Sequence, residues 1–118
     1  MICHVVLFSP RPDADVAIKR ALAQQVVEAL RGIKSIRRAV VGRAVSIDPG
    51  YQRQMGHEAY EFACVIDFDD ADGLKDYLND PAHAELGRLF WAVCERTVVS
   101  EVETVDLQSQ DAVDLLAK

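Results

Sequence analysis

The sequence predicts one small α+β domain in which two helices cover one face of a four-stranded antiparallel sheet, in βαββαβ order. Two observations predict this fold. Four extended runs, rich in β-branched and aromatic residues, are interrupted twice by segments with the 3.6-residue periodicity of amphipathic helices. The first strand is apolar on both faces, although the helices can cover only one. Uncovered apolar sheet usually marks an interface, so we expect two copies to pair through it as a barrel.

Length and composition indicate a single soluble domain. The chain has 118 residues, half of them apolar and 27% charged, which is typical of a folded globular protein rather than a disordered one. Its net charge of −6 disfavours nucleic acid and anionic membranes as partners. The sequence shows no signal-cleavage pattern and no apolar run near the ~20 residues of a membrane span, so we expect a cytoplasmic protein.

The first strand is expected over residues 2–8, with His4 as its one polar side chain. Prolines at positions 10 and 12 end it, because proline cannot donate to the ladder. His4, Val6 and Phe8 alternate along this strand and are therefore expected on one side of the sheet.

An amphipathic helix of about four turns is expected next. Asp13 or Asp15 is its predicted N-cap and Gly32 its predicted C-cap. The apolar residues that recur three and four positions apart are Ile18, Leu22, Val26, Ala29 and Ile33.

Two further strands follow, at residues 36–47 and 60–68. Gly42 in the first of them predicts a bulge or a close backbone approach. Residues 48–57 lack periodicity and contain a Pro-Gly turn signal, so a mobile loop that includes His57 is expected there.

The remaining segments complete the fold. Asp69-Asp70 is expected to cap a short helix that breaks before Pro81, where Asp80 can cap a new helix. The last strand is expected over residues 97–107. Residues 1–107 thus form the predicted domain, and residues 108–118 form a tail that is either a short helix or frayed.

Several of these segments resemble the stress-responsive A/B barrel domain (Dabb) family, from residue 2 to about residue 106. The residues that carry the resemblance are Ile2-Cys3-His4-Val5-Val6-Leu7-Phe8, Val41-Gly42-Arg43, Phe68-Asp69-Asp70 and, above all, Tyr77-Leu78-Asn79-Asp80-Pro81-Ala82-His83. The resemblance implies a ferredoxin-like monomer that pairs into a dimeric α/β barrel.

What the resemblance implies about activity is mixed. The family contains plant stress-related proteins, bacterial members of unknown role and polyketide-cyclising enzymes. In the cyclising enzymes a histidine of the Pro-Ala-His element works with a nearby tyrosine, and the matching positions here are His83 and Tyr77. His4 matches the histidine of the first strand, whereas Phe62 stands where the cyclising enzymes have another histidine. That departure weakens the transfer of the cyclase function.

Elementary chemistry also favours His83 as a base. It lies in the first turn after Pro81, where the helix dipole disfavours a protonated imidazole. The alternative is that His83 only packs the helix start and that Tyr77 belongs to the core edge, because the sequence does not fix the distance between them. For His4, a hydrogen-bonded core role is the commoner alternative to a catalytic one.

A ligand pocket is expected between the sheet and the helices. Its predicted lining residues are Val6, Phe8, Phe62, Cys64 and Leu86. The aromatic residues Tyr60, Phe90 and Trp91 are bulky enough to line it too, although such residues are usually core.

No cofactor or metal is expected. The three histidines and the carboxylates of Asp67, Asp69 and Asp70 match no familiar metal-ligand spacing, and no glycine pattern for nucleotides or flavins is present. Cysteines at positions 3, 64 and 94 lack a Cys-x-x-Cys spacing and are expected to be small buried hydrophobes.

Three functions remain open from the sequence. The first is a homodimer that binds a small apolar or aromatic molecule, with cofactor-free cyclase or lyase chemistry in which His83 is the base, Tyr77 the hydrogen-bond donor and His4 an assistant. The second is a non-catalytic stress-response or assembly protein. The third is a cofactor-free monooxygenase, which rests on fold analogy and would be favoured by Trp91 and His83 around one cavity.

Overall fold

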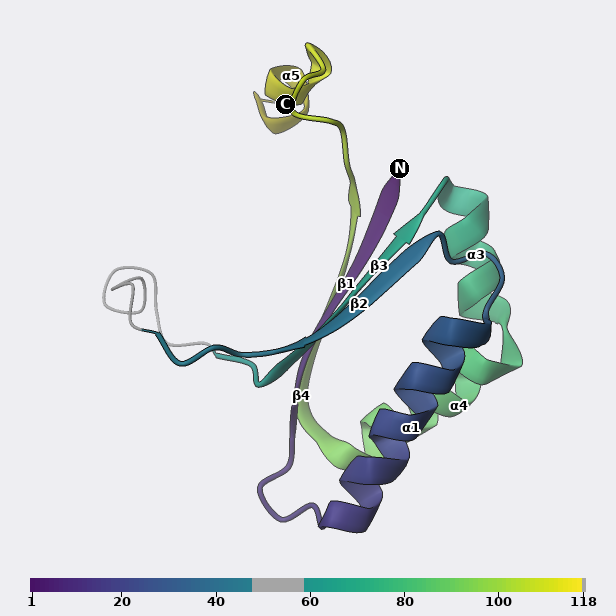
Figure 1. Ribbon diagram of the computed structural model, residues 1–118, viewed down its shortest axis with the longest axis vertical. Coiled ribbons are helices and arrows are strands. Elements are labelled where there is room, and N and C mark those ends of the chain that lie inside the picture. The colour runs from purple at the N-terminus through teal and green to yellow at the C-terminus, as the bar shows by residue number, and fades with distance from the viewer. Residues whose placement is uncertain (48–58, 118) are drawn as a thin grey trace.

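The computed structural model describes residues 1–47 and 59–117, and the elements follow the predicted order. In chain order they are β1 (Ile2–Pro10), α1 (Val16–Gly32), β2 (Arg38–Arg43), β3 (Phe62–Phe68), α3 (Ala71–Asn79), α4 (Pro81–Val93), β4 (Cys94–Glu103) and α5 (Asp111–Ala117). The strands form one antiparallel sheet in the order β2-β3-β1-β4 (Figure 1). This is the ferredoxin-like α+β fold, so the predicted fold class is confirmed.

β1 is a central strand of the sheet and pairs with both β3 and β4. His4 stands opposite Ile66 on β3 and opposite Glu101 on β4. Residues that are directly opposite each other share a face of the sheet. The register therefore places these three side chains on one face, together with Val6 and Phe8 by alternation along β1.

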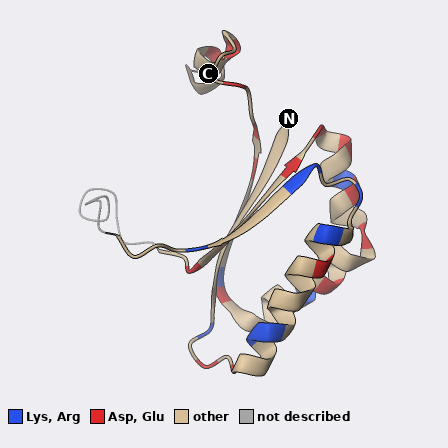
Figure 2. Cartoon of the chain, in the orientation of Figure 1, with Lys and Arg blue, Asp and Glu red and all other residues tan. Residues whose placement is uncertain are grey.

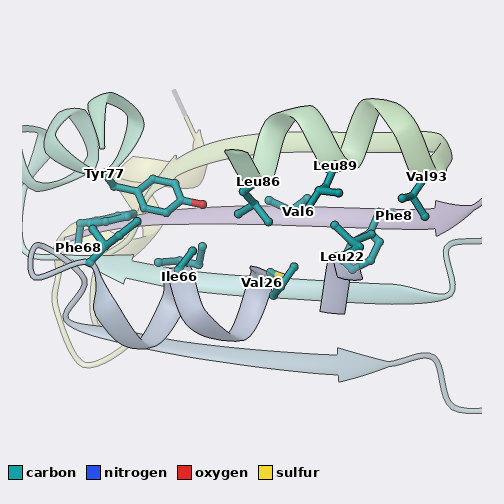
Figure 3. Packing of buried hydrophobic residues seen from close by; sticks show 13 residues of the cluster. Val6, Phe8, Leu22, Val26, Ile66, Phe68, Tyr77, Leu86, Leu89 and Val93 are labelled. Atoms are coloured by element: carbon teal, nitrogen blue, oxygen red, sulfur yellow. The ribbon is translucent and has the colours of Figure 1, made fainter. Parts of the chain in front are cut away.

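The core lies between this face and the helices α1, α3 and α4, which all cover the same side of the sheet (Figure 1). Its largest fully buried side chains are Tyr77, Phe68, Ile66 and Val93. Figure 3 shows Phe68 and Ile66 rising from β3 toward Tyr77 on α3 and toward the helices. Full burial of one such side chain stabilises the fold by roughly 1.5–3 kcal/mol, so this layer fixes the position of Tyr77.

Aspartate side chains cap three of the helices. Asp15 accepts a hydrogen bond from the Ile18 amide at the start of α1, and Asp70 accepts one from the Gly73 amide at the start of α3. Asp80 accepts from the Ala82 amide, with proline at the first position of α4. The predicted caps at Asp70 and Asp80 are confirmed, and of the two candidates for α1 the cap is Asp15.

The predicted C-cap of α1 at Gly32 is wrong by one residue. Gly32 is the last helical residue, and Ile33 is the cap, with its amide donating to the carbonyl of Ala29. Ile33 is buried in the core, so apolar burial rather than a left-handed glycine ends this helix.

The predicted strand boundaries also need correction. β2 ends at Arg43 rather than at residue 47, and Gly42 pairs with Ala63 in regular register, without the predicted bulge. The register shift of the sheet lies instead at Ser9 and Pro10, where proline cannot donate to the ladder. β3 begins at residue 62 rather than 60, and β4 spans Cys94–Glu103 rather than residues 97–107, with Cys94 also serving as the C-cap of α4.

The side of the sheet that faces away from the helices is apolar, as predicted; we call it the open face. Val40, Val98 and Val102 are 46%, 43% and 41% exposed there. The apolar side chains that alternation and register place on the open face are Cys3, Val5, Leu7, Val40, Ala63, Val65, Val98 and Val102, and the polar side chains of Arg38, Asp67 and Ser100 share this face.

The C-terminal segment leaves the sheet on the side opposite the helices (Figure 1). It contains the short helix α5, which has no buried residue, so of the two predicted states the helix is the one that forms. The predicted loop at residues 48–57 and its His57 lie outside the described residues. Within the described ranges, no helix is long and apolar enough to cross a membrane.

Candidate functional site

A cavity of about 480 Å³ lies between the sheet and the helices; we call it the site cavity. Four elements supply its polar groups: β1 supplies His4, α3 supplies Tyr77, α4 supplies His83, and β4 supplies Glu101 and Thr97. The rest of its wall is mainly apolar, with side chains such as Val6, Ile66 and Leu86. A small apolar molecule would meet these polar groups in the site cavity.

The rings of His4, Tyr77 and His83 form a continuous row. The ring centres of His4 and Tyr77 are 5.4 Å apart, and those of Tyr77 and His83 are 4.8 Å apart, both in edge-on arrangements. Tyr77 thus stands between the two imidazoles. The structure brings together the three residues that the sequence singled out, from strand 1 and from both sides of the helix break.

The helix break between α3 and α4 produces this closeness. The Asp80 amide donates to the Tyr77 carbonyl at 3.2 Å, and the His83 amide donates to the Asp80 carbonyl at 2.9 Å. Asp80 is therefore the C-cap of one helix and the N-cap of the next. Because the chain turns at this one residue, Tyr77 and His83 face each other across it.

Glu101 is the site residue that the sequence analysis missed. Its carboxylate oxygen Oε1 lies 2.8 Å from Nδ1 of His4. An ionised carboxylate only accepts hydrogen bonds, so Nδ1 carries the proton in this pair. A neutral His4 then has a bare Nε2 that can accept a proton or a hydrogen bond.

His83 is held in its neutral form. Burial lowers the pKa of the imidazole below its ordinary value of 6.5, and the nearby charge of His4 lowers it further. A hydrogen bond with the Leu78 backbone and the charge of Asp80 oppose this shift without cancelling it. The direction agrees with the expected neutral imidazole, but the causes are burial and His4 rather than the helix dipole.

Tyr77 is held in its protonated form. Burial raises the pKa of its hydroxyl to about 12, with a smaller contribution from Cys64. Figure 3 shows the hydroxyl pointing along the sheet toward Leu86. At neutral pH the hydroxyl can therefore donate a hydrogen bond to a molecule in the site cavity, and it cannot serve as a base.

The predicted ligand-pocket residues divide between two places. Val6, Cys64 and Leu86 line the site cavity, whereas Phe8 and Phe62 line a second hollow at the other end of the sheet. The pleat sets which side Phe8 faces but not how far along the strand it lies, and at about 3.3 Å per residue it is roughly 13 Å beyond His4.

The bulky aromatics follow a similar division. Phe90 and Trp91 line the site cavity, and Trp91 lies at its mouth because 87% of its surface is exposed. Tyr60 lies outside it, with the guanidinium of Arg96 4.8 Å from its ring centre.

The cysteines and carboxylates behave as ordinary fold elements. Cys3 and Cys64 are buried and Cys94 is half-buried, all three as free thiols. Asp69 pairs with Arg37 at 2.6 Å. In residues 1–47 and 59–117, no three histidine, cysteine or acidic side chains are grouped so that they could hold a metal ion.

Comparison with known families settles the membership of the chain. The family model of the stress responsive A/B barrel domain, Dabb, matches residues 2–104. The chain belongs to this family. The Dabb match covers every strand and the helices α1, α3 and α4, and it ends before α5.

Several solved structures are similar in fold to this Dabb protein. A dimeric ferredoxin-like protein of unknown function from Bacteroides fragilis is 27% identical, with a TM-score of 0.63 over 87% of this chain and 95% of that one. A Dabb family protein from Mesorhizobium loti is 18% identical, with a TM-score of 0.68 over 89% and 97%. The hydroxynitrile lyase of Passiflora edulis is 16% identical, with a TM-score of 0.68 over 89% and 96%. No functionally curated protein matches the sequence.

Proposed function

We propose that this Dabb protein is a homodimer that binds a small apolar or aromatic molecule in the site cavity and removes a proton from it without a cofactor. The observation that carries the proposal is the convergence of His4, Tyr77 and His83 on one largely apolar cavity. A volume of about 480 Å³ lies within the range of small-molecule pockets.

Each polar group has a role in this proposal. His83 is the general base, because an imidazole with a lowered pKa is neutral at physiological pH. Tyr77 donates a hydrogen bond to the carbonyl or phenolate oxygen on which charge develops, because its proton is retained. His4 assists from the other side of Tyr77, and Glu101 holds its ring in one orientation.

The ligand that fits these groups has an apolar or aromatic body and an acidic hydroxyl or a carbonyl beside it. Mandelonitrile is a suitable probe, because it is an aromatic hydroxynitrile and the Passiflora edulis enzyme of the same fold is a hydroxynitrile lyase. In the test reaction the base takes the hydroxyl proton, the carbon–carbon bond to the nitrile breaks, and benzaldehyde forms. The departing cyanide then takes the proton as hydrogen cyanide, so the base is regenerated.

The experiment follows benzaldehyde release by absorbance for the native chain and three variants. His83→Ala should lose about 100-fold or more of the rate, because a positioned base contributes 10²–10⁴-fold, and Tyr77→Phe should be slowed as well. Gln24→Ala, on the exposed side of α1, is the control and should match the native rate. If the native chain neither cleaves nor binds mandelonitrile, and 4-propylphenol also leaves the cavity residues unperturbed in NMR spectra, the proposal is abandoned.

The homodimer is supported by the open face and by the relatives. The Bacteroides fragilis and Thermobifida fusca structures are described as dimeric. A sheet face with eight apolar side chains is of the kind that proteins cover with a partner. Sedimentation at micromolar concentration tests this part separately, and a monomer there would refute it.

A second candidate function is a cofactor-free monooxygenase. The specific observation in its favour is that Trp91 and His83 both border the site cavity, the arrangement that the sequence analysis named as favouring it. Oxygen uptake in the presence of a dihydroxynaphthalene, with and without His83→Ala, distinguishes it from lyase chemistry.

The third candidate is a non-catalytic assembly protein, and the open face is the one observation that supports it. It would hold if the dimer forms but the site cavity binds none of these probes.

A further inference from the structure

A second hollow, of about 600 Å³, lies between α1 and the edge strand β2; we call it the groove. Its walls are aliphatic, with Leu22 and Ala23 from α1 and Val41 from β2. Val41 lies on the face of the sheet that the helices cover, because it pairs with the buried Cys64, yet it is 57% exposed. Helix α1 thus leaves the edge strand partly uncovered, and the groove is an apolar surface open to solvent.

Three cationic side chains stand at one end of the groove: Lys19, Arg20 and Arg43. Arg43 is the last residue of β2, and its strand partner Phe62 pairs in turn with Phe8 near the end of β1. Lys19 and Arg20 lie near the start of α1, which follows β1 after a short connection, so they are at this same end. Figure 2 shows basic positions on the first half of α1 and at the end of β2. The guanidinium of Arg43 lies 5.7 Å from the centre of the Phe62 ring, which holds its charge beside the groove.

The groove continues from its cationic end as an aliphatic surface. Along α1, Ala23 is about 6 Å beyond Lys19, at 1.5 Å per residue. Along β2, Val41 is about 7 Å back from Arg43, at roughly 3.3 Å per residue. The groove is therefore charged at one end and apolar along its length.

No described carboxylate neutralises the three cations. In residues 1–47 and 59–117, no ion pair joins Lys19, Arg20 or Arg43 to an acidic side chain. Acidic side chains are also missing from the described lining of the groove. Because the chain as a whole carries a net charge of −6, three unpaired cations around one apolar hollow are a local exception, and they favour an anion there.

A molecule that fits the groove has an aliphatic body and one negative group at its end. The aliphatic walls favour the body, because burial of apolar surface is the main source of affinity in such a hollow. A carboxylate suits the cationic end, since a guanidinium group binds it with two parallel hydrogen bonds. The volume of about 600 Å³ lies within the range of small-molecule pockets.

We propose that the groove is a second binding site, for a free aliphatic monocarboxylate of medium chain length. The alkyl chain lies along the aliphatic walls, and the carboxylate lies among the three cations. This site goes beyond the proposed function, because His4, Tyr77 and His83 do not line the groove. Val26 and Cys64 border both hollows, so the bound acid is one layer of side chains away from the site cavity without entering it.

Calorimetric titration of the full chain with sodium octanoate and with 1-octanol tests the proposal. The two probes share an alkyl chain and differ in charge. The native chain should bind octanoate at least about tenfold more tightly than octanol, a difference of about 1.4 kcal/mol that lies within what three exposed charge pairs can supply. Equal affinities for the two probes, or no binding of octanoate at millimolar concentration, would overturn the assignment.

Removal of the cations tests their role. One variant replaces the three groove cations by glutamine: Lys19→Gln, Arg20→Gln and Arg43→Gln. A control with the same net charge replaces three exposed cations outside the groove: Arg31→Gln, Lys34→Gln and Lys75→Gln. The groove variant should lose about tenfold in octanoate affinity and keep its octanol affinity, and the control should match the native chain. A control that loses as much as the groove variant would show that net charge, and not the groove, selects the anion.

Filling the groove tests its location. Ala23→Phe places a ring between the walls, whereas Ala21→Phe makes the same change at an exposed position of α1 outside the groove. Ala23→Phe should lose at least about tenfold in affinity for both probes, because the ring takes the apolar contacts of the alkyl chain. Ala21→Phe should bind as the native chain does, and circular dichroism checks that both variants fold. Equal binding by the two variants would place the acid elsewhere.

NMR spectra separate this site from the site cavity. Octanoate should shift the backbone amide signals of Ala23 and Val41 more than the ring signals of His4 and His83. The reverse order would put the acid in the site cavity and overturn the groove assignment. The proposed function is tested with other probes, so a chain that ignores mandelonitrile and 4-propylphenol but binds octanoate in this way loses the proposed function and keeps the groove site.

Discussion

His4 and Glu101 form a pair across the β1–β4 ladder, with Nδ1 of the imidazole 2.8 Å from the carboxylate. The ring of His4 is almost wholly buried, whereas the Glu101 carboxylate is partly exposed at the site cavity. The pair sets both the orientation of the ring and the nitrogen that carries its proton.

Replacement of Glu101 by alanine should change the tautomer of His4. In the native chain the carboxylate holds the proton on Nδ1, and in Glu101→Ala the proton should redistribute toward Nε2. Loss of a hydrogen bond to a charged group should also lower the free energy of unfolding by about 1–3 kcal/mol. ¹⁵N NMR of the imidazole measures the tautomer directly, and an Nε2-protonated ring in the native chain would contradict the role given to Glu101. Glu103→Ala, two residues along the same strand, is the matched control.

Tyr77→Phe should alter stability only at alkaline pH. The folded pKa of about 12 lies above the ordinary value of 10, so the unfolded state loses its proton first and stability falls as the pH rises from 10 toward 12. The variant lacks this contribution, whose slope is at most about 1.4 kcal/mol per pH unit. Denaturant unfolding at pH 8, 10 and 11 measures the free energy of unfolding of both chains. The difference between the native chain and the variant should be constant near pH 8, and the native chain should lose stability relative to the variant at pH 10 and 11. Cys64, whose pKa burial raises to about 11, is present in both chains and cancels in the comparison.

His83 should titrate below its ordinary pKa of 6.5. Burial and the charge of His4 both lower its pKa, so the base form persists below pH 6.5 and activity should fall only at lower pH. The stability contribution has the same direction: it is complete above pH 6.5 and is lost as the pH falls through the folded pKa, because the unfolded chain takes up the proton more readily.

The variant His4→Asn separates the two causes of that shift. Without the His4 imidazole, whose positive charge when protonated opposes a second one nearby, the pKa of His83 should move back toward 6.5 while burial continues to hold it below. NMR titration of the His83 ring measures the midpoint. A midpoint at or above 6.5 in the native chain would refute the assignment of a neutral base.

Val98→Lys should dissociate the dimer without unfolding the protomer. The side chain is 43% exposed on the open face of one protomer, so the charge is tolerated there. In the dimer it would be an unpaired buried cation, which should raise the dissociation constant at least about 100-fold. Ala21→Lys, on the exposed side of α1, is the control for sedimentation and for circular dichroism. An unchanged dimer would place the interface elsewhere.

The sequence predicted the parts of the site that depend on local patterning. Alternation put His4, Val6 and Phe8 on the helix side of β1, and the Asp80-Pro81 break indicated where α3 ends and α4 begins. Tyr77 and His83 lie close together because the chain turns at that break, and the break is visible in the local sequence.

The parts that depend on long-range register were not predictable. Glu101 meets His4 only because the last strand pairs with the first at one particular register, across 97 residues of sequence. A shift by one residue would have turned the carboxylate to the open face. Phe8 and Phe62 were assigned to the correct face but not to the correct end of the sheet, since alternation carries no information about position along a strand.

The most direct test of the account is to fill the site cavity while leaving the fold intact. Gly87 lines the cavity on α4, and a β-carbon built there meets nothing within 4 Å. Gly87→Leu should therefore retain or raise stability, by up to about 1 kcal/mol of helix propensity, while its side chain occupies the ligand's space. Gly32→Leu, at an equally open position on α1, is the matched control.

Titration with mandelonitrile and 4-propylphenol, followed through the NMR signals of His4 and His83, supplies the measurement. The account predicts saturable shifts in the native chain and in Gly32→Leu, and their loss in Gly87→Leu. Binding that survives equally in a folded Gly87→Leu chain would show that the site cavity is not where the ligand lies, and would contradict the proposed function.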